Sequence, residues 1–317
     1  MVGSGAAGLS PVLVLVHGIG GRRDAERERT EWLMALSNGA REAGHSDFAG
    51  VLAAQDIRFA DYSDLMIDSG AQGATDSMDG DDALFLVGFL ETIVDELLEG
   101  TDDPHTKSAL VEAKAQLDAT GAQGFGQVVR ILGSAVTSLL RIQPLRRAGQ
   151  WTSERRLLFA LAQVGRYLGR KELRHGHSLD VVVRARVLSS LPSNRPVVVV
   201  AHSLGSVVAF EALHEYARPV QLFVTLGSPL ATAAVVLNRL RPAPPATPPR
   251  VEQWLNFWDR DDIVVSRPRL DKHIAVNAAG VVPTSERVDS DGLWVHSATK
   301  YLAQAKVAGR IVEALRG

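Results

Sequence analysis

Short apolar runs alternate with longer amphipathic stretches along much of the chain. Three runs are almost purely apolar, which indicates strands buried on both faces of a sheet: 12–16, 197–200 and 221–226. Two weaker runs, 55–62 and 251–258, predict further strands, and 274–276 a short edge strand. Apolar residues recur at helical spacing in 22–44, 178–191, 204–217, 235–240 and 298–315. This alternation predicts an α/β protein with a mostly parallel central sheet flanked by helices.

The alternation stops between residues 64 and 150. A polar, Gly/Asp-rich stretch at 69–82 predicts a loop, and helical patterns follow at 83–98, 107–119, 127–142 and, beyond 150, at 157–168. We therefore expect one domain over 1–317 with a helical cap inserted at 64–150. The apolar faces of the cap either pack on the core or line an acyl pocket with Phe85, Leu86 and Phe89.

Composition narrows the function classes. The 317 residues are 46% hydrophobic and 22% charged, with a net charge of −2, which is typical of a globular protein and not of a nucleic-acid binder. The absence of cysteine excludes disulfides, thiolate catalysis and cysteine-ligated zinc. The sequence contains neither a signal-peptide pattern nor an apolar stretch long enough to cross a membrane, so we expect a cytoplasmic protein without an integral membrane segment.

The segment 196–206 is the strongest candidate for chemistry. Four consecutive valines lead through Ala201 and His202 to Ser203, and a helical pattern begins within a few residues. Such a strand–turn–helix unit exposes a serine hydroxyl and leaves the next N–H, that of Leu204, available to an oxyanion. In the pattern G-x-S-x-G, Ala201 replaces the first glycine and Gly205 is the second. The simpler alternative is that Ser203 only caps the helix.

A glycine-rich loop at 17–21 follows the first strand. Its glycines match neither the dinucleotide nor the P-loop spacing, because Arg23 stands where a third glycine would be needed. The pair His17-Gly18 instead suits the second half of an oxyanion hole, with the N–H of Ile19 as donor. We expect His17 to orient this loop and not to act as the base.

The chain order is serine, then an acidic cluster at 259–262, then His296. With the stretches HGIGG, AHSLGS, TLGSP, NFWDRDDIV and WVHSATKYL, the sequence resembles the α/β-hydrolase superfamily, and within it the serine esterases and lipases. These stretches span most of residues 12–317, and the 64–150 insertion matches no pattern of the family. The resemblance implies a single α/β-hydrolase domain with Ser203 as nucleophile, His296 as base and an aspartate as acid. It also implies Leu204 and Ile19 as oxyanion donors, and no metal or organic cofactor.

Three aspartates compete for the acid position. Asp259 follows the strand directly and has the shortest reach, whereas Asp261 is expected to face solvent near Arg260. The family pattern of an aspartate, one further residue and an apolar valine favours Asp262. Histidine 202, beside the nucleophile, is expected to point away from Ser203 and to be structural.

The resemblance implies a serine carboxylic-ester hydrolase acting on a small acyl or lipid-like substrate, with no nucleic-acid partner. Two alternatives stay open: a thioesterase or acyltransferase acting on a carrier-bound acyl chain, and a catalytically silent hydrolase-fold binding module. Acyl length, leaving group and oligomeric state are open as well. A basic cluster is either a solvated surface or a contact for anionic groups: Arg141, Arg146, Arg147, Arg155 and Arg156.

Overall fold

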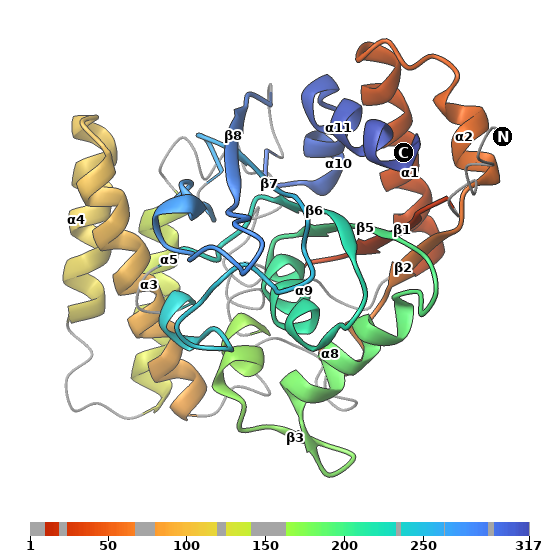
Figure 1. The fold of residues 1–317 in the computed structure, drawn as a ribbon. Coiled ribbons are helices and arrows are strands. Elements are labelled where there is room, and N and C mark those ends of the chain that lie inside the picture. Colours follow the sequence, from red (N-terminus) through yellow and green to blue (C-terminus); the bar gives the residue numbers. More distant parts are fainter. Residues whose placement is uncertain are drawn as a thin grey trace, which may run out of the picture.

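The central feature of the fold is a six-stranded parallel sheet with helices on both faces (Figure 1). The computed structural model describes residues 10–18, 24–66, 80–118, 125–140, 163–232, 236–262, 264–290 and 295–316. The strand order is β2-β1-β5-β6-β7-β8, and every neighbouring pair runs parallel. The strands are β1 Val12–Val16, β2 Ile57–Ala60, β5 Val197–His202, β6 Val220–Leu226, β7 Trp254–Asp259 and β8 Thr284–Val288. The predicted α/β class with a parallel central sheet is confirmed.

The apolar runs of β1 and β5 supply both faces of the sheet. Successive side chains of a strand point to opposite faces, and the alternate residues of these two strands fall into two separate clusters of buried side chains. Leu13 and Val198 join the cluster on one face, whereas Val12 and Val197 join the other. A strand buried on both sides needs apolar residues at every position, which explains the unbroken valine run.

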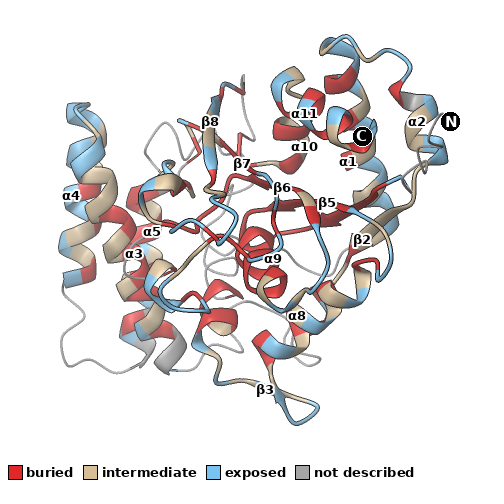
Figure 2. Cartoon of the chain, in the orientation of Figure 1, coloured by how far each residue is buried: buried red, intermediate tan, exposed pale blue. Residues whose placement is uncertain are grey.

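Helices α1 Ala25–Glu42, α10 Ala298–Leu302 and α11 Ala305–Arg316 cover one face. Helices α8 Leu179–Ser190 and α9 Leu204–Glu215 cover the other. Figure 2 shows α9 buried along nearly its whole length. The expected helix over 298–315 is divided into α10 and α11 by a turn at Ala303 and Gln304.

Three further helices lie to one side of the sheet in Figure 1: α3 Gly80–Gly100, α4 Pro104–Asp118 and α5 Phe125–Leu140. They correspond to three helices predicted within the insertion. Buried side chains of α3, including Leu86 and Phe89, belong to the same cluster as α8 and α9. Residues 163–169 are also helical. The arginine cluster at 141–156 and most of the predicted loop at 69–82 lie outside the described residues.

Two local predictions were wrong, and one helix was missed. Residues 274–276 form no strand, since only Ala275 makes an isolated bridge; the edge of the sheet is β8. β8 has the sequence TSERV with only Val288 buried, so it carries no apolar run that sequence analysis could recognise. The short helix α2 Phe48–Ala54 was not predicted, and the helix expected at 235–240 is a 3₁₀ turn at Leu237–Arg239.

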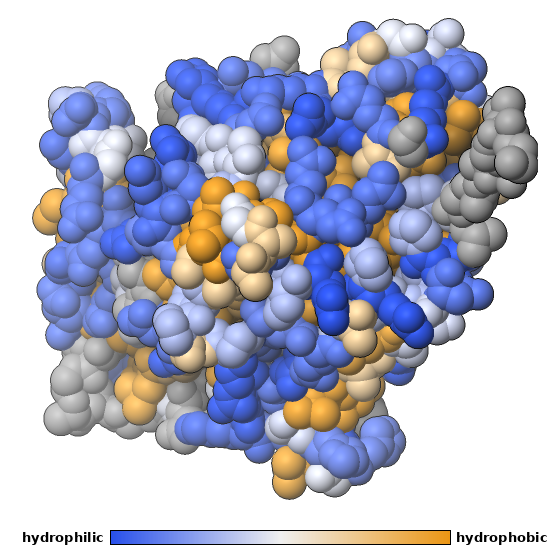
Figure 3. Space-filling view, in the orientation of Figure 1, coloured by the Kyte–Doolittle hydropathy of each residue, from blue (hydrophilic) through white to orange (hydrophobic). Residues whose placement is uncertain are grey.

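The face of the molecule drawn in Figure 3 is mainly polar. On the face drawn in Figure 3, charged and polar side chains cover most of the area, and hydrophobic side chains gather in smaller patches between them. Among the described residues, no helix is both long enough and apolar enough to span a bilayer.

Candidate active site

Ser203 occupies the turn between β5 and α9 in a strained backbone conformation. Its φ of 54° and ψ of −130° lie where residues with a side chain are rarely found, and such strain persists only when the surroundings impose it. The Ser203 N–H donates to the Leu226 carbonyl at 3.0 Å, which ties the turn to the neighbouring strand β6. The Ser203 side chain does not cap α9. The side chain of Ser203 therefore does not act as the cap of this helix.

The turn is possible because two glycines let backbones approach closely. A Cβ on Gly205 would lie 2.1 Å from the His17 carbonyl oxygen, and one on Gly18 would lie 2.7 Å from the Cβ of Ser203. Real Cβ atoms do not come this close, so both positions require glycine. The loop after β1 and the start of α9 are thus pressed together around Ser203.

Ser203, His296 and Asp262 form one hydrogen-bonded chain. The Ser203 Oγ lies 2.9 Å from His296 Nε2, and His296 Nδ1 lies 2.7 Å from Asp262 Oδ2. All three side chains are at most 2% exposed. Ser203 follows β5, Asp262 follows β7 and His296 follows β8. These residues, 93 and 34 positions apart, meet because the three strands belong to one parallel sheet whose carboxyl ends lie at the same edge.

Of the three candidate aspartates, the structure places Asp262 against His296. Asp259 has a different set of contacts: its Oδ1 accepts the Asp261 N–H at 2.9 Å and its Oδ2 accepts the Ser290 N–H at 2.5 Å. Asp259 thus fixes the turn after β7 and the loop after β8. The Asp261 side chain is 23% exposed and lies 3.8 Å from Arg260.

Tyr301 is a member of the site that sequence analysis missed. Its hydroxyl donates to Asp262 Oδ2 at 2.7 Å, the same oxygen that faces His296, and it accepts the Asp259 N–H at 3.1 Å. Burial raises the pKa of the Tyr301 phenol well above its ordinary value, and Asp262 raises it further, so the phenol stays a neutral donor. It lies in the stretch WVHSATKYL, five residues after His296, but no spacing rule marks it.

Gly227 is the second residue that was missed. Its φ is +54°, and a Cβ there would lie 2.7 Å from Asp262 Oδ2 and 3.1 Å from His296 Nδ1. The space taken by the Asp262–His296 hydrogen bond is therefore available only because position 227 has no side chain. A glycine after a strand predicts a turn, but the neighbouring sequence does not indicate which distant side chains occupy the space beside it.

His202, the residue before Ser203, contacts His296. Its Nε2 lies 2.7 Å from the backbone oxygen of His296, and the two ring centroids are 4.8 Å apart. Trp32 meets the His202 ring edge-on at 6.1 Å. This arrangement links the residue before the nucleophile to the main chain of His296.

His17 fixes the loop after β1. Its Nδ1 lies 2.7 Å from the Gly18 carbonyl oxygen and its Nε2 lies 3.2 Å from Asp61 Oδ1, while the Tyr62 hydroxyl donates to the His17 carbonyl at 2.5 Å. The hydrogen bond with His17 holds the pKa of Asp61 well below its ordinary value. These contacts agree with the expected orienting function of His17.

Of the two expected oxyanion donors, Leu204 lies within the described residues and Ile19 does not. Leu204 is the first residue of α9, so no preceding helical turn accepts its N–H. Ile19 lies outside the described residues, although Gly18 before it is in place against Ser203. Within the described ranges, no group of three or more His, Asp or Glu side chains is arranged to hold a metal ion.

A second buried polar cluster lies further along α9. Arg170 Nη2 lies 2.6 Å from Glu211 Oε1, and Arg170 Nη1 lies 2.5 Å from Asp180 Oδ2. Arg184 contacts Asp180 at 2.7 Å, and the Tyr167 hydroxyl donates to Glu211 at 2.8 Å. Both carboxylates are 1% exposed. The cluster joins the segment before β3 Leu173–Arg174, helix α8 and helix α9.

The chain matches no family model, no curated protein and no solved structure. The arrangement of the residues themselves is therefore the basis for assigning a function.

Proposed function

We propose that the protein is a serine hydrolase of the α/β-hydrolase type that cleaves a carboxylic ester of an acyl or lipid-like compound. The observation that carries the proposal is the buried chain from the Ser203 hydroxyl through His296 to Asp262, with distances of 2.9 and 2.7 Å. A serine within hydrogen-bond reach of an imidazole, itself oriented by a carboxylate, is the arrangement that activates a hydroxyl for attack on an acyl carbon.

In this mechanism, Ser203 Oγ attacks the carbonyl carbon while His296 Nε2 takes its proton. Asp262 accepts the proton on His296 Nδ1 in a hydrogen bond, which fixes the tautomer and stabilises the imidazolium that forms. His296 then gives its proton to the leaving alcohol. Water, deprotonated by the same histidine, hydrolyses the acyl-enzyme and releases Ser203.

The strained turn also supports the proposal. A serine that only capped α9 would need neither a φ of 54° nor a glycine at 205. In the proposed mechanism, the N–H groups of Leu204 and Ile19 bind the oxyanion. The acyl or lipid-like substrate is what the resemblance to serine esterases and lipases implies.

The test is covalent labelling with a fluorophosphonate, followed by turnover of a short p-nitrophenyl ester. Ser203→Ala is expected to abolish labelling and to lower kcat on the order of 10⁶-fold, because losing the nucleophile of such a triad has an effect of this size. Ser189→Ala, an exposed serine on α8, is the matched control and should label as the wild type does. Far-UV circular dichroism and the thermal midpoint establish that both variants fold.

Wild-type protein that neither labels nor turns over the ester would overturn the proposal and leave a silent binding module. Faster turnover of an acyl thioester than of the matching oxygen ester would move the assignment to a thioesterase that uses the same three residues.

A further inference from the structure

His202 and Ser203 are consecutive residues, and both contact His296. His202 is the last residue of β5, and Ser203 follows it. The Ser203 Oγ lies 2.9 Å from His296 Nε2, whereas His202 Nε2 lies 2.7 Å from the His296 carbonyl oxygen. One dipeptide thus meets His296 twice, once at its ring and once at its main chain. Both ends of the contact between serine and imidazole are therefore tied to the same strand.

The direction of the hydrogen bond between His202 and His296 follows from its acceptor. A carbonyl oxygen has no proton to give, so His202 Nε2 carries the proton and donates it. The distance of 2.7 Å is at the short end of the usual range for such bonds. Because His202 is only 8% exposed, the bond is shielded from competition with water.

His296 belongs to neither a helix nor a strand. It lies in the turn before α10, so its own position is not set by a helical or sheet ladder. β5, by contrast, is buried at every residue and is paired with β1 on one side and β6 on the other. The bond from His202 therefore fixes a turn residue to the centre of the sheet.

The His202 ring is itself held by its neighbours. Trp32 meets it edge-on at 6.1 Å, the Tyr301 ring lies at 6.4 Å, and the His296 ring is tilted by 43° at 4.8 Å. A Cβ on Gly18 would lie 3.2 Å from His202 Nδ1, so the loop after β1 borders the other ring nitrogen. A side chain that is packed in this way has its rotamer fixed, which keeps Nε2 aimed at the carbonyl.

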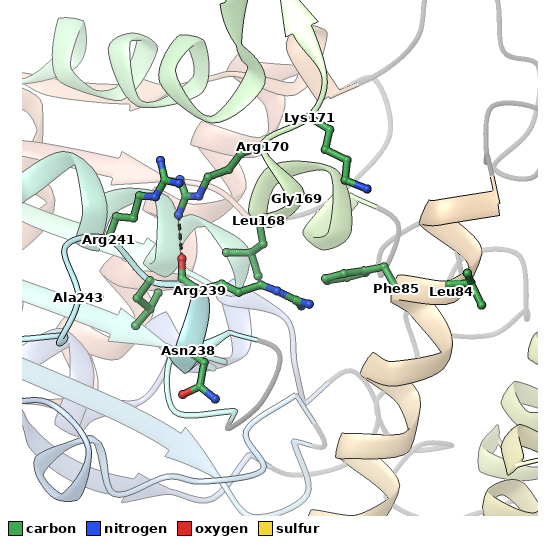
Figure 4. A pocket seen from close by; sticks show the side chains of 11 residues that line it. Leu84, Phe85, Leu168, Gly169, Arg170, Lys171, Asn238, Arg239, Arg241 and Ala243 are labelled. Carbon is green, nitrogen blue, oxygen red and sulfur yellow. Dashed lines mark hydrogen bonds between the residues drawn. The ribbon is translucent and has the colours of Figure 1, made fainter.

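A second turn of this protein is held in a similar way. In Figure 4, Arg170 Nη2 donates to the main-chain carbonyl of Arg239 at 2.8 Å, at the end of the 3₁₀ turn Leu237–Arg239. Arg170 is in turn bound by Asp180 and Glu211. In both places a firmly held side chain donates to the carbonyl of a turn residue. The difference is that the turn fixed to β5 carries the base of the proposed reaction.

We propose that His202 is a positioning residue for this base, an inference that rests on the proposed function. By donating its Nε2–H to the His296 carbonyl, His202 sets the distance between His296 Nε2 and the Ser203 hydroxyl. Proton transfer needs hydrogen-bond distance, and a misplacement of about 1 Å lowers the rate about 10²-fold. Because His202 Nε2 binds the main chain and not a substrate, its loss lowers kcat and leaves KM nearly unchanged.

Ester turnover and the rate of fluorophosphonate labelling test the proposal in three variants. His202→Leu removes the donor, so kcat and the labelling rate should both fall about 10²-fold. His202→Gln restores an N–H of similar reach and should recover about tenfold of this loss. His214→Leu is the matched control and should keep the wild-type kcat, because His214 also has a ring nitrogen 2.9 Å from a backbone carbonyl, that of Phe210, but does not contact the base.

Two further measurements separate positioning from stability. The extent of labelling at completion counts the folded, competent molecules, so a slower rate is not mistaken for unfolding. Nitrogen-15 NMR of the histidine rings, with His202→Gln to assign the signal, detects the proton on His202 Nε2 without any turnover, and it decides the proposal even if His202→Leu does not fold.

Three outcomes would overturn the proposal: a His202 Nε2 without a proton, wild-type kcat in His202→Leu, or equal kcat in His202→Leu and His202→Gln. The last would assign the effect to packing of the ring. If the wild type labels and His202→Leu labels equally fast, this proposal fails alone and the proposed hydrolase stands. If the wild type does not label at all, the proposed function fails, and the positioning function fails with it.

Discussion

Helix α9 separates two buried polar clusters that are built in opposite ways. The first cluster lies at the N-terminal end of α9 and contains Asp262. The Asp262 carboxylate accepts hydrogen bonds from His296 Nδ1, the Tyr301 hydroxyl and the Val264 N–H, all groups that can be neutral. Toward its end, Asp180 and Glu211 are held by the guanidinium groups of Arg170 and Arg184. Guanidinium groups stay protonated at any ordinary pH, so the positive charges of the second cluster are permanent.

The comparison shows how burial can serve two purposes. Paired opposite charges offset the cost of removing each charge from water, and they join α8 and α9 into one unit. A carboxylate with neutral donors keeps an uncompensated charge, which can stabilise a cation that forms only when His296 takes a proton. The proposed catalytic function therefore belongs to the cluster whose charge is not balanced, and the predictions below separate the two clusters on this basis.

Among the variants that compare the two clusters, the largest effect is expected at Asp262. Asp262→Asn keeps the shape of the side chain but removes the charge and favours the wrong tautomer of His296, so kcat should fall on the order of 10⁴-fold. Asp259→Asn is the matched control, because the Asp259 carboxylate accepts the backbone N–H groups of Asp261 and Ser290. It should lower thermal stability with a much smaller loss of ester turnover. Collapse of activity in Asp259→Asn with near-normal Asp262→Asn would assign the acid to Asp259.

The next effect is expected at Gly227, which makes room for the Asp262–His296 hydrogen bond. Gly227→Ala places a methyl group against both side chains and should lower kcat about 10²-fold, the effect of misplacing a catalytic group by about 1 Å. Gly280→Ala is the control, since Gly280 also has a positive φ, +78°, but open space around its Cβ position. Both variants place an alanine at positive φ, which should lower the free energy of unfolding by about 1–2 kcal/mol. Denaturant unfolding measures this loss in each variant. Equal kcat in the two would show that the crowding at 227 is harmless.

Sequence analysis succeeded where the signal is local. The valine run and the small residues around Ser203 predict the strand–turn–helix unit. A strand buried on both faces needs apolar residues, and a helix packed closely against it needs small ones. Asp262 and His296 were found through the order and spacing of short motifs, and the structure brings them together. Gly227 and Tyr301 could not be assigned, since their importance depends on atoms 35 and 39 residues away in the chain. β8 was missed for a different reason, because an exposed edge strand needs no apolar run.

The second cluster predicts a pH-dependent stability. Burial alone would raise the pKa of Asp180, but hydrogen bonds from Arg184 and Arg170 outweigh it and lower the pKa to about 2. A carboxyl pKa below its unfolded value of about 3.9 stabilises the folded state above that pH by about 2–3 kcal/mol. This contribution is lost as the pH falls through 3.9 toward 2.

Urea unfolding of Asp180→Asn at several pH values measures this effect. The deficit relative to wild type should be largest near neutral pH and should shrink as the pH approaches about 2. Asp64→Asn, whose side chain is 60% exposed and paired with Arg186, should show a deficit below about 1 kcal/mol at every pH. A pH-independent deficit in Asp180→Asn would assign its effect to lost packing and not to charge.

The smallest effect is expected at Tyr301, and it distinguishes chemistry from packing within the first cluster. Tyr301→Phe removes one of the hydrogen bonds that hold Asp262 Oδ2 in place against His296. Because the carboxylate is then positioned less precisely, kcat should fall about tenfold. The Asp262 carboxylate, with one donor fewer, stabilises the imidazolium of His296 more strongly. The acidic limb of the kcat/KM profile should therefore move to higher pH. Tyr216→Phe, which removes a hydroxyl bonded to the Pro192 carbonyl, should leave the profile unmoved. If kcat falls while the acidic limb of the kcat/KM profile stays at the same pH, Tyr301 contributes packing only. The described hydrogen bonds that set the properties of the Asp262 carboxylate would then be those from His296 and the Val264 N–H.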